Sequence, residues 1–428
     1  VGSEMCIRDS NYNADFSDRY KNELIEPNSS LTFEADVVDA NAAVENGAIK
    51  VEIVADLNGT LTETAQNSCL SRAEGIYVKE DVITVGRVAA TLADNFTVSG
   101  EAEVKYGIEK VLLAQSDVCL AHAEARDNVL TLEGDCALVL TYIAVGGGLK
   151  SQLIKIPFRE EVNAEGFSGE GEINVFCRVR NTRIHLDVLE DAENNIFTAE
   201  INIAVRAQNI VEEDEDVICD AYSATHELEL SFCRVASTVS YGMTAASFNS
   251  AGEISVPGDA EITGFCGLKA AVTSVRPLDG KLTLEGVLTG TLLASGGGDA
   301  AYPFAVPFVH TVENDDITEN LVVRADAAVT EFEYRQGRNV SMNFTVCVSA
   351  NLYRNIEENC VADAVEGEEL SETMGAIEVC IAKAGETLWQ IAKSLRMSKE
   401  DIMAANPELV TPLEKDEKLV VYHCIAKD

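Results

Sequence analysis

The chain alternates apolar and polar side chains in three runs, Val51-Glu52-Ile53-Val54-Ala55, Ile201-Asn202-Ile203-Ala204-Val205 and Met342-Asn343-Phe344-Thr345-Val346. A period of two residues is typical of a β-strand, because successive side chains of a strand point to opposite faces. Each run is followed by a cysteine at the same distance, since Ile53 to Cys69, Ile203 to Cys219 and Phe344 to Cys360 all span 16 residues. The shared spacing indicates copies of one β-rich unit.

Further motifs recur in the same order. We therefore predict tandem copies of about 150 residues each. The first copy lacks the Leu-Thr-Leu-Glu-Gly motif, so we expect it to begin in mid-module. The recurring motifs are Leu-Thr-Leu-Glu-Gly at 130–134 and 282–286, glycine triplets at 146–148 and 296–298, and Pro-Phe pairs at 157–158 and 307–308.

These patterns predict a mainly β protein. Alternating runs, glycine-marked turns and little helical periodicity favour tandem antiparallel β-rich modules, sandwich-like or open-barrel-like. Pro157 and Pro307 are expected at the beginnings of strands, where an edge or entry proline is tolerated although it has no amide hydrogen. The glycine triplets are expected to form hairpin turns rather than phosphate-binding loops, because no Gly-Lys-Ser/Thr follows them.

The carboxy-terminal residues predict a small α+β module with the order strand, helix, helix, strand. Thr387 and Gln390 have the spacing of a capping box, so a helix should begin after Thr387. Ser398 is a second helix start, and Pro407 ends the second helix. The apolar face of the first helix consists of Leu388, Ile391, Ala392 and Leu395. The two flanking β-prone runs are residues 377–381 and 419–422.

Residues 379–392 and 401–409 resemble a LysM module, a small fold that binds N-acetylated sugars. The resemblance implies a shallow groove between the loop after the first strand and the loop after the second helix. Asp416 departs from the family pattern, in which glycine is common at this place. Some chains of this kind use the module to grip another protein. Carried over to this chain, the groove residues are Gly385, Glu386, Thr387, Leu388, Asn406, Pro407 and Leu409.

The groove residues also have a purely structural interpretation. Thr387 and Pro407 would then only cap and end helices. Leu388 and Ile391 are expected in the core of the module rather than in contact with a ligand. If the groove is used, Asn406→Ala should weaken partner binding and leave the fold intact.

The composition disfavours several functions. The chain has 428 residues, 72 of them acidic and 32 basic, and a net charge of −40, which repels phosphate backbones and anionic lipids. We therefore expect neither nucleic-acid binding nor membrane insertion. The five histidines are scattered without a metal or nucleophile motif, so we expect no enzymatic activity, no metal and no cofactor. Chance pairs of carboxylates leave glycoside cleavage open, although the single tryptophan, Trp389, leaves little room for a sugar platform.

The twelve cysteines form no CxxC pair and are expected to be free, buried thiols in a reducing compartment. Cys69, Cys219 and Cys360 recur, and we expect structural burial, with a redox role as the weaker alternative. The acidic residues 212–216 are expected to form a solvated loop, because they lack the alternating spacing and turn glycine of a calcium-binding loop.

The repeats, ending in Cys219-Asp220-Ala221-Tyr222-Ser223, resemble SPOCS modules. Tandem SPOCS modules followed by a LysM module are the architecture of the SipL-like spore-coat assembly proteins of endospore-forming Firmicutes. The resemblance covers roughly residues 11–424. It implies a scaffold in the mother-cell cytoplasm at the forespore surface, where its partner is a spore-coat morphogenetic ATPase or another coat protein.

The expected domain organisation follows from the repeats and the carboxy-terminal module. Residues 1–10 match nothing else in the chain and look like a non-native artefact, so the true amino terminus is an open question. The predicted segments are 11–100, a truncated first β module and connection; 101–255, a second β-rich SPOCS-like module; 256–365, a third; 366–375, an acidic linker; and 376–424, a LysM module.

Three hypotheses for the function remain. The first is a non-enzymatic scaffold of spore-coat assembly and encasement that binds a coat morphogenetic partner through the LysM module, with β modules that dock partners or form a homo-oligomer. The alternative is an exported cell-wall protein that binds peptidoglycan, a polymer containing N-acetylglucosamine. The third is an enzyme hidden in the acidic β modules.

Overall fold

The computed structural model describes residues 30–45, 48–62, 66–186, 195–258, 260–295, 301–315, 317–370 and 377–422. Residues 1–10 therefore lie outside the described residues. The chain divides into two compact units, Val1–Asn67 and Ser68–Asp428. In the first unit, β1 (Ser30–Glu45) and β2 (Ala48–Thr62) form an antiparallel hairpin.

The first alternating run lies in β2 and forms the expected strand. Its apolar side chains are exposed, however, with exposed fractions of 56% for Val51, 60% for Ile53 and 54% for Val54. Among the described strands, β2 pairs only with β1. Alternation therefore produces a strand here, although these three apolar side chains stay exposed.

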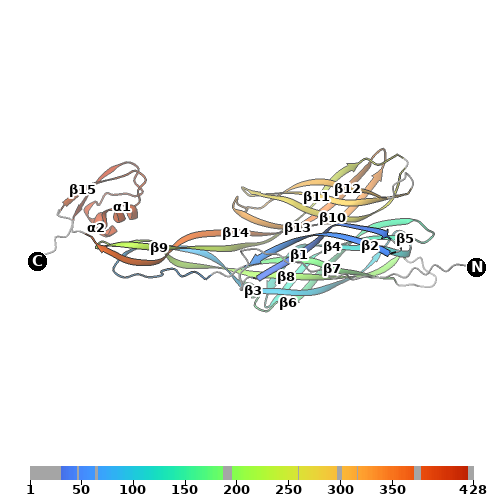
Figure 1. Ribbon diagram of the computed structural model, residues 1–428, viewed down its shortest axis with the longest axis horizontal. Coiled ribbons are helices and arrows are strands. Elements are labelled where there is room, and N and C mark those ends of the chain that lie inside the picture. Colours follow the sequence, from blue (N-terminus) through green and yellow to red (C-terminus); the bar gives the residue numbers. More distant parts are fainter. Residues whose placement is uncertain are drawn as a thin grey trace, which may run out of the picture. The chain divides into compact units, whose positions relative to one another are not determined.

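Six strands at the start of the second unit form two antiparallel sheets of three strands (Figure 1). The consecutive strands β4, β5 and β6 make one sheet, and β8 lies between β3 and β7 in the other. The strands are β3 (Tyr77–Glu103), β4 (Ile108–Arg126), β5 (Val129–Ala144), β6 (Leu149–Asn163), β7 (Glu172–Leu186) and β8 (Ile196–Tyr222).

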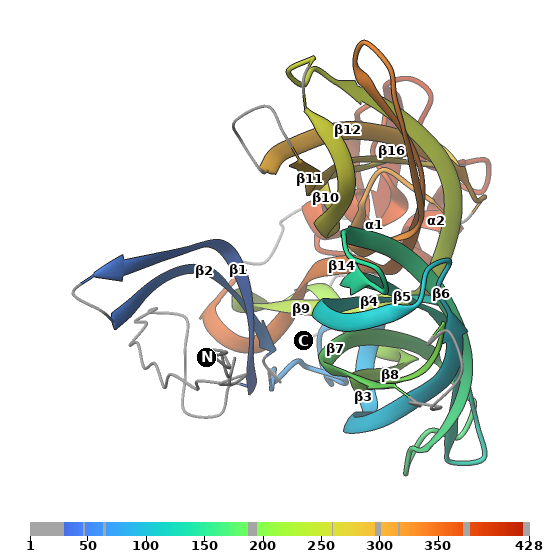
Figure 2. The same ribbon diagram turned by 90° about the vertical axis from the view of Figure 1, so that its right-hand side faces the viewer.

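The next six strands repeat this topology. The consecutive strands β10, β11 and β12 make one sheet, and β14 lies between β9 and β13 in the other. Figure 2 looks along the strands and separates these sheets. The strands are β9 (His226–Ile254), β10 (Glu261–Leu278), β11 (Lys281–Ser295), β12 (Ala301–Glu313), β13 (Leu321–Gln336) and β14 (Val340–Glu369).

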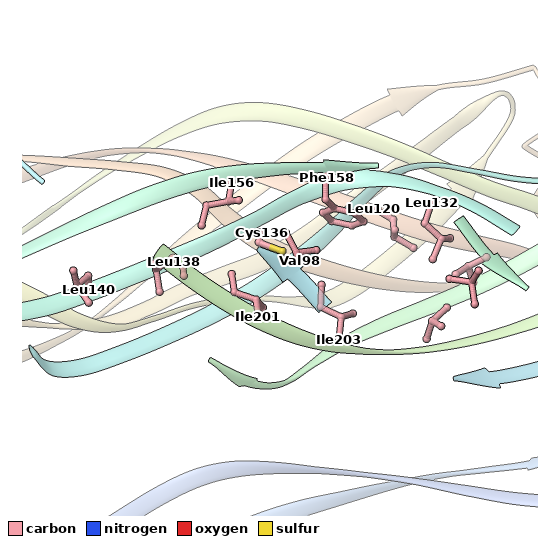
Figure 3. Packing of buried hydrophobic residues seen from close by; sticks show 14 of the residues in the cluster. Val98, Leu120, Leu132, Cys136, Leu138, Leu140, Ile156, Phe158, Ile201 and Ile203 are labelled. Carbon is pink, nitrogen blue, oxygen red and sulfur yellow. The ribbon is translucent and has the colours of Figure 1, made fainter. Parts of the chain in front are cut away.

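Each set of six strands encloses an apolar core between its two sheets. In the first core, Leu138 and Leu140 of β5 lie among Ile201 and Ile203 of β8, all with no exposed surface (Figure 3). In the second core, Met342 and Phe344 of β14 pack with the leucines of β11. Burying one such side chain contributes about 1.5–3 kcal/mol, so these runs drive the formation of both cores. The predicted class, antiparallel β-rich modules, is confirmed.

The repeated motifs occupy equivalent positions in the two sets. Gly134 of β5 lies opposite Phe158 of β6, and Gly286 of β11 lies opposite Phe308 of β12. A Cβ atom on Gly286 would lie 2.2 Å from Cζ of Phe308 and 2.5 Å from the carbonyl oxygen of Ala271. The glycine of the repeat therefore makes room for a phenylalanine ring and for the neighbouring backbone.

Two sequence-based placements need correction. Pro157 and Pro307 lie in the middle of β6 and β12 rather than at strand beginnings, and they are tolerated because both strands are at sheet edges. The acidic residues 212–216 belong to β8, where they pair with residues 82–86 of β3, so they form no loop. Glu213 is neutralised there by Arg87 at 2.6 Å, because cross-strand charge pairs make such a strand tolerable.

The sequence-based expectation that all cysteines are free thiols is wrong. Cys119 of β4 and Cys347 of β14 form a disulfide, although 228 residues separate them in the chain. Spacing along the chain carries no sign of this pair, since the two strands belong to different sets and meet only in the folded protein.

The turn prediction is confirmed at 146–148, where the amide of Gly147 donates to the carbonyl oxygen of Ala144 at 2.9 Å. Residues 296–298 lie outside the described residues.

The carboxy-terminal elements have the predicted order, strand, helix, helix and strand. β14 continues through 366–369, within the segment predicted as an acidic linker, and residues 371–376 lie outside the described part of the chain. The domain boundaries inferred from sequence stay predictions. The elements are β15 (Ile377–Ala382), α1 (Leu388–Leu395), α2 (Lys399–Ala405) and β16 (Glu417–Tyr422).

Candidate functional site

The carboxy-terminal module has its own apolar core under the two helices. Ile391 and Ala392 of α1 are buried, and Leu388 and Leu395 are partly buried against them, so the face predicted from helical spacing is confirmed. Leu419 and Val421 of β16 close this core from the sheet side. The module therefore folds around side chains of both helices and of its sheet.

Both helices begin where the sequence predicts. The side chain of Thr387 accepts a hydrogen bond from the amide of Gln390, and the side chain of Gln390 accepts one from the amide of Thr387 at 2.8 Å. This reciprocal capping box supplies partners for two amides that a helix start otherwise leaves unpaired. Ser398 caps α2 with its side chain, which accepts a hydrogen bond from the amide of Asp401 at 3.0 Å. The cap at Thr387 therefore fixes the residue at which the loop after β15 ends and α1 begins.

Backbone hydrogen bonds bring the two sides of the predicted groove together. The amide of Gly385 donates to the carbonyl oxygen of Leu413 at 2.7 Å, and the amide of Leu413 donates to that of Glu386 at 3.1 Å. Gly385 has a φ of 87°, which favours glycine, and a Cβ atom there would meet no atom within 4 Å. The loop after β15 and the loop after α2 are therefore neighbours, and their surface at Gly385 is open.

The predicted groove residues fall into three groups by exposure. Gly385, Thr387 and Pro407 are exposed. Glu386, Leu388 and Asn406 are half-buried, whereas Leu409 is buried in the module core. The sequence-based prediction of the groove did not include Val410, which is 77% exposed in the same loop as Pro407 and Leu409. An apolar residue after a helix-ending Pro is a weak signal, and only the folded loop distinguishes Val410 from the buried Leu409.

Asn406 holds the module together. Its Nδ2 donates to the carbonyl oxygens of Ile402 at 2.9 Å and Val420 at 2.8 Å, and its Oδ1 accepts from the amide of Val420 at 3.0 Å. The side chain thus joins the end of α2 to β16. The sequence-based expectation that Asn406→Ala leaves the fold intact is therefore replaced by the expectation of a less stable module.

Asp416, where the LysM resemblance led us to expect glycine, holds the loop after β15 through its side chain. Its carboxylate accepts hydrogen bonds from the amide of Ala384 at 3.0 Å and from Nζ of Lys383 at 3.1 Å. These two interactions lower the pKa of Asp416, with the bond from Ala384 as the larger cause. The departure from the family pattern therefore ties down the loop that carries Gly385 and Thr387.

The second face of α1 contacts the end of β8 and the start of β9. Nε1 of Trp389 donates to Asp220 at 2.8 Å, and Nζ of Lys393 contacts the same carboxylate at 2.5 Å. One turn further on, Arg396 pairs with Glu227 at 2.8 Å. Trp389, Lys393 and Arg396 lie at i, i+4 and i+7, so this second stripe was visible in the sequence, although its partner 169 residues earlier was not.

Tyr222 completes this contact. Its ring packs edge-on against Trp389 with the centroids 5.0 Å apart, and its hydroxyl donates to the carbonyl oxygen of Met397 at 2.6 Å. Burial, together with Tyr77 and Glu400, raises the pKa of Tyr222 to about 12, so the phenol remains a donor at neutral pH. Tyr222 is buried in the same apolar cluster as the helices, and the module is therefore packed onto the end of β8.

A hollow lies among β6, β9, β13 and β14 of the β-rich body. Its volume is about 850 Å³, and Lys155, Glu331, Glu333 and Thr345 are among its lining residues. Thr345 donates to Glu331 at 2.7 Å, and Lys155 pairs with Asp135 at 2.8 Å. Lys155, Glu331 and Thr345 are therefore engaged with neighbouring strands, and neither a histidine nor a cysteine is among the residues that line the hollow. We therefore place the candidate site in the carboxy-terminal module.

Among the residues that the structure describes, no group of three or more His, Cys, Asp or Glu side chains has an arrangement suited to a metal ion. Neither α1 nor α2, the helices in this part of the chain, has the length and apolar composition needed to cross a bilayer.

The fold and the site together define a β-rich protein with a carboxy-terminal binding module. Residues 380–413 match the LysM domain family. The chain thus carries a LysM domain, which indicates a carbohydrate-binding module. Searches of the curated proteins and of the solved structures found no match to this chain.

Proposed function

We propose that this chain is a non-enzymatic binding protein whose LysM domain holds an N-acetylated glycan between the loop at 383–387 and the loop at 406–413. The observation that carries this proposal is the pairing of Gly385 and Glu386 with Leu413, which makes one continuous surface of two loops. Gly385, Pro407 and Val410 are exposed on it. An open glycine lets a sugar ring approach the backbone closely, and an exposed valine supplies apolar contact.

The contact with the β-rich body leaves this surface available. The body is contacted by Trp389, Lys393, Arg396 and Met397, and none of these belongs to the predicted groove. In our proposal the body thus holds the LysM domain in one orientation through the second face of α1. A ligand would then bind to a domain that is already positioned, which lowers the ordering cost of binding.

We further propose that the body is a scaffold in spore-coat assembly and encasement, in the mother-cell cytoplasm at the forespore surface. The support is the resemblance of the repeats, ending in Cys219-Asp220-Ala221-Tyr222-Ser223, to SPOCS modules. Two sets of strands with one topology suit a scaffold, because equivalent surfaces allow several tethered contacts with a coat morphogenetic ATPase, another coat protein or a second copy.

Glycan binding is tested by sedimenting the full chain with insoluble peptidoglycan and by titrating it with oligomers of N-acetylglucosamine. We expect co-sedimentation and saturable binding. Val410→Arg, which places a large charged side chain on the groove surface, should weaken both. The matched control is Val309→Arg on β12, because Val309 is 66% exposed and lies outside the LysM domain. Equal binding by the two variants and the unaltered chain would assign the glycan to another surface.

The scaffold role is tested separately in sporulating cells. A fluorescent fusion of the full chain should encircle the forespore, and affinity purification should recover coat proteins more strongly than purification of a chain that lacks 376–428. Enrichment in the cell wall without coat proteins would instead favour the alternative, an exported peptidoglycan-binding protein. Glycan binding in vitro is common to both hypotheses, so the location of the fusion distinguishes them.

A further inference from the structure

Cysteines from separate parts of the chain meet where the long strands leave the two cores. Sγ of Cys69 lies 3.1 Å from Sγ of Cys233, although 164 residues separate them. Cys360 lies directly opposite Cys233 in the pairing of β14 with β9. Cys69 and Cys360 occupy equivalent places in the repeat, 16 residues after their alternating runs. Thus the repeat brings its own cysteines together in space.

Backbone hydrogen bonds hold Cys69 at this place. The amide of the next residue, Leu70, donates to the carbonyl oxygen of Val361 in β14 at 2.8 Å. The carbonyl oxygen of Leu70 accepts from the amide of Ile218 in β8 at 3.3 Å. The short segment around Cys69 thus bridges two strands, and the proximity of the two sulfurs follows from how the backbone is anchored.

The three thiols differ in access. Cys69 and Cys233 are partly exposed, whereas Cys360 is fully buried in an apolar cluster with Ile83 and Val217. A small reagent therefore reaches the pair Cys69 and Cys233 and not Cys360. Two accessible thiols whose sulfurs lie 3.1 Å apart are suited to thiol–disulfide exchange.

We propose that Cys69 and Cys233 are a modification site, at which exchange with a low-molecular-weight disulfide such as glutathione disulfide forms a second intramolecular disulfide. One protein thiol, as its thiolate, attacks a sulfur of the small disulfide, breaks that bond and releases one small thiol, which takes up the proton. The other protein thiol then attacks the mixed disulfide and releases the second small thiol. Two electrons pass from the cysteine pair to the reagent, and the sulfurs approach by about 1 Å to reach the covalent distance.

The new bond would fasten the segment that follows the first compact unit. That segment is joined to β14 and β8 by the two backbone bonds of Leu70. A disulfide to β9 adds a covalent link that closes a loop of 164 residues, and links across long loops restrict the unfolded chain strongly. Oxidation should therefore protect residues 66–76 from proteolysis. Burial raises the pKa of the Cys69 thiol to about 12, so the reaction should be slow at neutral pH and faster at alkaline pH.

The test uses the full chain in buffers with graded ratios of glutathione disulfide to glutathione, quenched with acid, alkylated and mapped as non-reduced peptides. We expect a peptide with Cys69 linked to one with Cys233, and a proportional loss of alkylation at both. The control Cys219→Ser should keep this link, because the Cys219 thiol faces the carbonyl oxygen of Lys79 instead. Cys233→Ser should abolish it, with circular dichroism confirming the fold.

Two outcomes would overturn the proposal. The first is that Cys69 is fully alkylated, and therefore still a free thiol, at every ratio of glutathione disulfide to glutathione that keeps the disulfide between Cys119 and Cys347 intact. The other is Cys69 held only as a mixed disulfide with glutathione while Cys233 stays alkylated. If Cys233→Ser unfolds, the peptide map of the unaltered chain still decides the matter, because linkage is read directly from the mass of the joined peptides.

Discussion

Nε1 of Trp389 donates a hydrogen bond of 2.8 Å to the carboxylate of Asp220, which precedes it by 169 residues. The bond joins the first helix of the LysM domain to the end of a strand from the β-rich body. The same carboxylate also pairs with Lys393. Asp220 therefore holds the domain to the body together with Tyr222 and Glu227, and it lies in the motif that ends the repeat.

Asp220→Ala should loosen this contact. Removing an acceptor of a charged hydrogen bond costs about 1.5–3 kcal/mol, and here both Trp389 and Lys393 lose their partner. Trp389 is the single tryptophan of the chain, so its fluorescence reports the contact directly, and we expect its emission to shift to longer wavelength as water gains access. Glu101→Ala, an exposed acidic residue on β3, is the control and should leave the emission unchanged. An unshifted spectrum for Asp220→Ala would contradict the contact.

The same contact should weaken in acid. Burial acts to raise the pKa of Asp220, but hydrogen bonds from Lys393 and Trp389 outweigh it and hold the pKa below the ordinary value of 3.8. A lowered pKa means that the stabilisation is fully present above pH 3.8 and is lost as the pH falls through the folded value. Tryptophan emission should therefore shift below pH 3.8. In Asp220→Asn this acid-induced shift should be absent, and its persistence would assign the titration to another group.

Val410→Arg should reduce the affinity for N-acetylglucosamine oligomers by about tenfold or more, which corresponds to about 1.4 kcal/mol. The arginine side chain would block the proposed groove and remove the apolar contact of the valine. Val410 is 77% exposed in the loop that pairs with Gly385 and Glu386. Isothermal titration calorimetry measures the change. Thermal unfolding of the variant should match that of the unaltered chain, which separates a lost contact from a lost fold.

Asn406→Ala should destabilise the LysM domain by about 1–3 kcal/mol, because it leaves the backbone groups of Val420 without their side-chain partner. The measurement is thermal unfolding followed by tryptophan fluorescence. Glu408→Ala, an exposed position two residues later, serves as the control and should unfold like the unaltered chain. A melt of Asn406→Ala that coincides with the control would show that Val420 finds other partners.

Gly286→Ala should destabilise the second β core by about 1–3 kcal/mol, the usual cost of overpacking. The added methyl group would lie 2.2 Å from the ring of Phe308 and 2.5 Å from a backbone oxygen, so neither neighbour can yield cheaply. Gly337→Ala is the matched change without a clash, since its nearest atom lies at 3.7 Å. Circular dichroism melts of the two variants should differ, and identical melts would mean that the sheet adjusts to the methyl group.

Much of the candidate site was accessible from sequence because its signals are local. Thr387 and Gln390 are three residues apart, and the bonds between them depend only on the helix that they start. The packing of Ile391 and Ala392 likewise follows from helical periodicity. The exposure of Val410 and the structural role of Asn406 were missed, since both depend on how a loop closes against β16.

The amino-acid sequence by itself determined the three alternating strands, the helix caps and the repeat, since alternation, capping and spacing act over a few residues and need no distant partner. Only the tertiary structure decided which distant residues meet: Trp389 with Asp220, Cys119 with Cys347, and Cys69 with Cys233. Such pairs lie well over a hundred residues apart, and their contact depends on how whole sheets pack. Local pattern carries no record of that packing, because each strand has the same alternation whichever sheet it joins.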